Sequence, residues 1–116
     1  MKIAPKGRQA ARLRQRKFEL LKRFSIPPDL LPGSLSLTHR RCGRPTCHCA
    51  TDKKGHPLWS LTFMVGGQKR VERIPQEWVE EVQRLVDAGQ EFKQAVAEVF
   101  AANAQLLALG RQQQGR

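Results

Sequence analysis

Three cysteines within eight residues form the part of the chain best suited to chemistry. Cys42, Cys47 and Cys49 lie in the segment CGRPTCHC, and His56 follows seven residues after the last of them. Zinc favours four soft or borderline ligands in a tetrahedron, which three thiolates and one imidazole provide. We predict a zinc site with these four ligands, because a turn before His56 would return it to the cysteines, whereas His48 between two ligands would point away. The alternative is three reduced cysteines that only pack a turn.

The number and placement of the cysteines also bear on the compartment. An odd count confined to one loop argues against a secreted disulfide framework and favours a reducing environment. The basic start of the chain is unlike an apolar signal core, and no apolar run approaches the ~20 residues of a membrane span. We expect a cytoplasmic protein that does not enter membranes.

The second distinctive feature is an excess of positive charge. The 116 residues carry 21 Lys and Arg against 10 Asp and Glu, a net charge of +11. Residues 1–24 hold nine basic and one acidic side chain, residues 34–75 hold eight and two, and residues 76–116 hold four and six. Solubility requires much less than this, so the front half is expected to bind a polyanion.

Nucleic acid is the polyanion that this distribution favours. Each Lys or Arg can neutralise a backbone phosphate, and such contacts dominate affinity without specifying sequence. We favour DNA, because a small sheet can enter a major groove, with structured RNA as an alternative. The predicted contacts come from the first helix, the cysteine loop and the following hairpin: Arg8, Arg12, Arg14, Arg16, Lys17, Arg40, Arg41, Arg44, Lys53, Lys54, Lys69, Arg70 and Arg73. The alternative for these residues is a solvated charged surface.

Catalysis is not expected from the residues present. An enzyme would need a thiolate with a base and an oxyanion site, paired carboxylates, a glycine-rich phosphate loop or a serine-histidine-acid set. None of these stands out, and most acidic residues fall on the polar face of the last predicted helix. We therefore expect a binding protein and no enzyme.

The pattern of apolar residues predicts the elements that must position these side chains. Residues 8–24 carry one apolar stripe among basic residues, which predicts a helix that ends before Pro27. Alternation predicts a strand from Gly33 towards the cysteines, a second around residues 59–65 and a third at 68–74. The expected fold is α+β: a basic N-terminal helix, a small three-stranded antiparallel sheet with a cysteine-rich, knuckle-like loop, and a long C-terminal helix. The predicted boundaries are a basic helical arm at 1–28, the sheet domain at 29–75, the helix at 76–110 and a disordered tail at 111–116.

The glycine pair after Val65 predicts a tight turn between the second and third strands. A two-residue loop would place Arg70 and Glu72 beside the apolar residues of the second strand, whereas a three-residue loop would place Val71 there. We prefer the longer loop, because it gives the apolar residues an apolar neighbour.

The last predicted helix carries an apolar stripe that runs unbroken from Trp78 to Gly110 in steps of four and three. This spacing continues through Gly89 without a break, so we predict one helix of about 50 Å. We expect its first half to pack on the sheet. A sheet of ordinary strand length covers only ~20 Å of it. We therefore predict a homodimer, with a coiled-coil-like contact through Val99, Asn103 and Leu106. The alternative is a monomer whose first helix folds back along the stripe.

Several motifs between residues 33 and 92 occur together: a Gly-Ser-Leu start, the CGRPTCHC pattern, a His-Pro before an aromatic strand, a basic glycine hairpin and a proline that opens a helix. In these motifs the chain resembles a family of short, uncharacterised bacterial proteins often encoded beside transposases or insertion sequences. The resemblance implies a mobile-element context and a transposase or recombinase as partner. Two functions remain open: an accessory DNA-binding module, and an adaptor that binds such a partner through the last helix.

Overall fold

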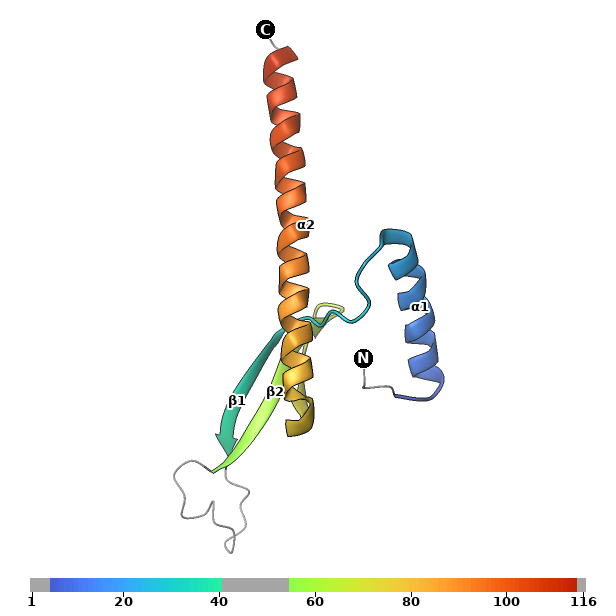
Figure 1. Cartoon of the computed structure of the whole chain (residues 1–116), viewed down its shortest axis with the longest axis vertical. Helices are drawn as coiled ribbons and strands as arrows, with labels where there is room; N and C mark the ends of the chain where they lie inside the picture. Colours follow the sequence, from blue (N-terminus) through green and yellow to red (C-terminus); the bar gives the residue numbers. More distant parts are fainter. Residues whose placement is uncertain (1–4, 41–54, 115–116) are drawn as a thin grey trace, which may run out of the picture. The chain divides into compact units, whose positions relative to one another are not determined.

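The computed structural model describes residues 5–40 and 55–114 (Figure 1). Along the chain the elements are α1 (Arg8–Phe24), β1 (Ser34–Arg40), β2 (His56–Val65), β3 (Gln68–Ile74), the short 3-10 helix η2 (Gln76–Trp78) and α2 (Val79–Gln114). The expected α+β fold of an N-terminal helix, a three-stranded antiparallel sheet and a long C-terminal helix is confirmed. The chain forms two compact units, Met1–Leu30 and Leu31–Arg116. Within the described residues, no helix has the length and apolar character needed to cross a membrane.

The first unit consists of α1 and the connector that follows it. The helix ends at Phe24. Ser25 caps it in the left-handed conformation with φ 54°, and the prolines beyond it cannot continue a helix. No residue of α1 is buried. The Lys17 ammonium lies 3.5 Å from the Asp29 carboxylate, so the connector turns back towards the helix.

The second unit contains the sheet, in which β2 lies between β1 and β3. Leu35 of β1 stands opposite Leu61 of β2, and Leu61 in turn stands opposite Glu72 of β3. At one end of the β1–β2 ladder, Arg40 pairs with His56.

The register of the β2–β3 hairpin contradicts the three-residue loop. Val65 pairs with Gln68, so only Gly66 and Gly67 form the loop. Their φ values are 58° and 81°, and positive φ at both central residues defines the type I′ turn that suits the twist of a hairpin. The backbone preference of the glycine pair therefore outweighs the gain from placing an apolar residue of β3 beside those of β2.

The core forms where α2 crosses the sheet. Its buried side chains are Leu61 of β2 and Val82, Leu85 and Val86 of α2. Trp78 was expected in this core but is 40 % exposed, because it belongs to the 3-10 turn, whose tighter winding shifts its side chain out of the stripe of α2.

α2 is a single helix through Gly89, as the unbroken phase predicted. It has 36 residues and a length of about 54 Å, and it continues beyond position 110, the predicted end, to Gln114. The 3-10 turn η2 that precedes it is capped by Pro75, whose carbonyl accepts a hydrogen bond from the Trp78 amide at 2.9 Å. Two carboxylates in the first turn, Glu80 and Glu81, interact favourably with the positive end of the helix dipole.

Candidate nucleic-acid interface

The two faces of the sheet differ in chemistry. Residues directly opposite each other on neighbouring strands place their side chains on the same face. On one face, Leu35, Trp59, Leu61 and Phe63 are buried or half-buried, and α2 covers them; we call this the covered face. The residues of the other, open face are Ser34, Ser36, Thr38, Arg40, His56, Leu58, Ser60, Thr62, Met64, Lys69, Val71 and Arg73.

The open face combines hydroxyl groups with positive charge. Five of its twelve side chains are hydroxyls and three are Lys or Arg, whereas none is a carboxylate. Arg73, Ser60 and Ser36 form one row across the three strands. Eight of the twelve residues are exposed and the others are half-buried. Cations and hydroxyls without a competing carboxylate are the side chains that bind phosphate oxygens.

The open face lies within a domain shared with other proteins. Residues 8–84 match a domain of unknown function, DUF6788. The chain belongs to this family. The DUF6788 match includes α1, the whole sheet and the start of α2, and it ends before the distal half of α2. The chain matches no curated protein and no solved structure.

The register separates the basic residues that the sequence grouped on the hairpin of the DUF6788 domain. Lys69 and Arg73 lie on the open face, together with Arg40 from the end of β1. Arg70 stands opposite Phe63 and therefore lies on the covered face. This division is the one that a two-residue loop implies, and the expectation of a longer loop was therefore wrong for Arg70.

The predicted contacts on α1 are all exposed. They are Arg8, Arg12, Arg14, Arg16 and Lys17. Two of them already face carboxylates, with Arg16 3.3 Å from Glu19 and Lys17 3.5 Å from Asp29. Exposed ion pairs of this kind contribute only ~0–1 kcal/mol, so a phosphate can replace the carboxylate at little cost.

The predicted metal ligands are only partly within the described residues. Cys42, Cys47 and Cys49 lie outside them, as do Arg41, Arg44, Lys53 and Lys54. His56 is the first residue of β2 and stands opposite Arg40, so it lies at the base of the segment that carries the cysteines. Residues 5–40 and 55–114 contain no cluster of three His, Cys, Asp or Glu side chains that could hold a metal. The zinc site stays a prediction.

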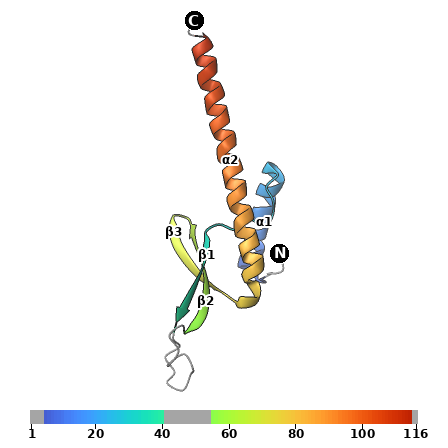
Figure 2. The same cartoon turned by 60° about the vertical axis from the view of Figure 1, so that its left-hand side comes forward.

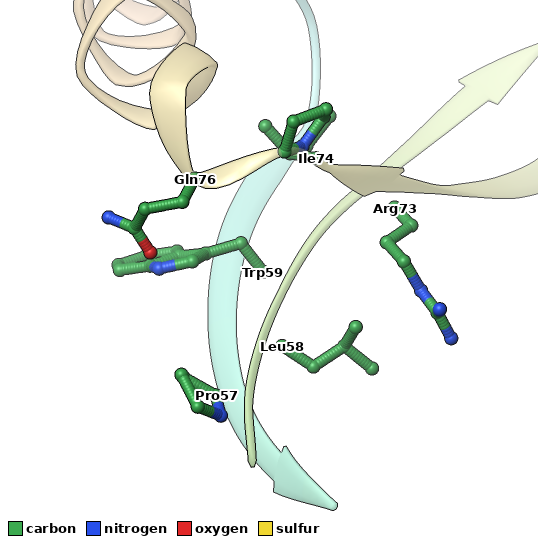
Figure 3. Close-up of a pocket in the computed structure, with 7 residues that line it drawn as sticks. Pro57, Leu58, Trp59, Arg73, Ile74 and Gln76 are labelled. Carbon is green, nitrogen blue, oxygen red and sulfur yellow. The ribbon is translucent and has the colours of Figure 1, made fainter. Parts of the chain in front are cut away.

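A shallow pocket that the sequence did not predict lies beside Arg73. It has a volume of about 260 Å³, and its walls are Pro57, Leu58, Trp59, Arg73, Ile74, Pro75 and Gln76 (Figure 3). It forms because β3 ends at Ile74, opposite Trp59, while β2 begins three residues earlier at His56. In Figure 3 the Gln76 side chain lies against the indole of Trp59. The walls suit a small apolar group next to a cation and offer no acid-base pair for catalysis.

Proposed function

We propose that this protein is an accessory nucleic-acid-binding protein, and that it binds the phosphate backbone of DNA through the open face of its sheet. The observation that carries this proposal is the composition of that face. Arg40, Lys69 and Arg73 surround adjacent hydroxyls, and the face bears no carboxylate. The three cations of this face therefore have no carboxylate beside them on the same face that would compete with phosphate.

Binding through phosphate contacts is electrostatic, and most of its affinity is independent of the base sequence. Each neutralised phosphate releases counterions. In a plot of the logarithm of the binding constant against the logarithm of the salt concentration, each such phosphate therefore contributes a slope of about −0.9. Serine and threonine hydroxyls add hydrogen bonds to phosphate oxygens and so fix the position of the duplex. The exposed arginines of α1 supply a second set of phosphate contacts.

The proposed context is a mobile element. It rests on the resemblance carried by the CGRPTCHC pattern and the motifs around it, which suggests a transposase or recombinase as partner. In this setting the protein holds DNA and performs no chemistry of its own.

The test is the binding of a fluorescently labelled duplex, measured by anisotropy over a series of salt concentrations. The variant Lys69→Gln/Arg73→Gln should bind more weakly and should reduce the salt slope by about 2. The matched control is Arg84→Gln/Arg111→Gln, which removes the same charge from α2. An equal effect of the two variants would show that only total charge matters and would contradict the proposed face.

An adaptor function is the second candidate, and the exposed distal half of α2 favours it. Phe100 and Leu107 are each 70 % exposed there, as expected of a surface that binds a protein. In that case duplex binding near physiological salt would be absent or insensitive to salt. The third candidate is an RNA-binding module. Competition between RNA and DNA for the same protein distinguishes it from the DNA-binding candidate, because such a module would prefer RNA.

A further inference from the structure

The distal half of α2 is an uncharged helix with large apolar side chains in solvent. Residues 99–110 contain no Asp, Glu, Lys or Arg. Five large side chains in this segment are between 51 % and 70 % exposed: Val99, Phe100, Leu106, Leu107 and Leu109. A helix that is this apolar and lacks charge is normally covered. Burying these side chains would remove apolar surface from water and so stabilise an interface.

The exposed side chains continue the stripe that the core buries. Leu85 and Val86 are buried, and positions 99 and 100 follow them by fourteen residues on the same side of the helix. Positions 106 and 107 follow after another seven. A straight helix turns such a stripe by only ~20° per heptad, so the sheet and the missing partner cover one continuous side of α2.

We propose that a second copy of the chain covers this stripe, with the two α2 helices antiparallel. A parallel copy on the same side would bring its own sheet into the space beside Val82, Leu85 and Val86 that the first sheet occupies. Figure 2 shows that sheet at the N-terminal end of α2. Packed helices are only ~8–10 Å apart, which leaves no room for two sheets between them. An antiparallel copy places its sheet at the opposite end of the helical pair, and only its last turn after Gly110 reaches the level of Gly89, where Leu31 packs.

One register pairs the stripe over its whole distal length, from the half-buried Phe92 to Gly110. It places Phe92 of one copy against Gly110 of the other, Val96 against Leu106, and Val99 against Asn103. Gly110 has open space around it, so the large Phe92 ring meets a position without a side chain. The same register brings Lys93 of one copy beside Leu107 of the other, on the flank of the contact.

The antiparallel arrangement separates the two sheets of the dimer. The two Leu85 positions, and with them the two sheets, would be about 50 Å apart along the helical pair. The dimer would therefore present two open faces at opposite ends of a rod. Pairing of the two α2 helices does not require nucleic-acid binding.

The test is a double-mutant cycle between positions 93 and 107, measured by sedimentation equilibrium. In one chain these positions are separated by about 21 Å, so any coupling between them must be intermolecular. Leu107→Lys should weaken the dimer, because it places a second ammonium beside Lys93 of the partner. Lys93→Glu/Leu107→Lys should restore association by at least about fivefold in Kd through the new ion pairs.

The control is Ala108→Lys, which adds the same charge on the opposite side of α2 and should leave the Kd unchanged. A double variant that is as dissociated as Leu107→Lys would overturn the antiparallel register. Wild-type protein that is monomeric at high micromolar concentration would overturn self-association and leave the stripe to a different protein.

Discussion

The backbone of Leu31 crosses α2 directly over Gly89. Its amide donates a hydrogen bond to the Leu85 carbonyl at 3.2 Å, and a Cβ atom added to Gly89 would lie 2.5 Å from the Leu31 carbonyl oxygen. The segment that leads into β1 is thus fixed to the helix by main-chain atoms. Glycine is needed at position 89 because any side chain would push the two backbones apart.

Gly89→Ala should therefore destabilise the protein, although alanine favours a helix by ~1 kcal/mol over glycine. The clash involves backbone and cannot be relieved by a rotamer change, so we expect a loss of about 1–3 kcal/mol and a clear fall in Tm. Thermal unfolding followed by circular dichroism measures this. Gln90→Ala, at an exposed neighbouring position of α2, is the control, and its Tm should not fall. A rise in Tm for Gly89→Ala would show that the close approach is wrong.

The hairpin offers a test of the two-residue turn. Gly66 and Gly67 both have positive φ and open space around them, so substitutions there act through backbone conformation alone. Gly66→Asn should be tolerated, because asparagine is favoured at this position of a type I′ turn. Gly66→Val should cost about 1–2 kcal/mol, since a β-branched residue resists positive φ. Urea unfolding midpoints compare the two variants, and equal midpoints would argue against the turn.

The sequence predicted the elements better than it predicted which side chains meet. The helix at 8–24, the three strands and the single long helix follow from the period of their apolar residues, which is a local property. The position of Arg70 did not follow, because one residue of loop length moves every side chain of β3 to the other face. The exposure of Trp78 did not follow from the sequence either, because it depends on a 3-10 turn that the apolar pattern does not predict. The pocket beside Arg73 depends on where β3 stops relative to β2, which is a tertiary property.

For the cysteine loop we predict one zinc ion per chain, bound by Cys42, Cys47, Cys49 and His56. Protein purified without added metal should contain zinc by elemental analysis, and a chelator should lower its Tm. His56→Asn should reduce the zinc content, whereas His48→Asn should leave it unchanged. Zinc near zero in the wild type, together with a Tm that is insensitive to chelator, would exclude the site.

The last prediction concerns the absence of carboxylates from the open face. Ser36 lies in the row with Ser60 and Arg73 and is exposed, so Ser36→Glu adds a negative charge where phosphate is expected without disturbing the core. At a separation of ~4 Å in water, like charges repel by about 1 kcal/mol, which corresponds to about a fivefold loss of affinity. The control is Gln68→Glu, which places the same charge at an exposed position of β3 that shares a face with Arg70. Duplex binding by anisotropy at low salt should weaken several-fold more for Ser36→Glu than for Gln68→Glu, and the difference should shrink as salt screens the charges. Equal losses for the two variants would place the duplex elsewhere on the protein.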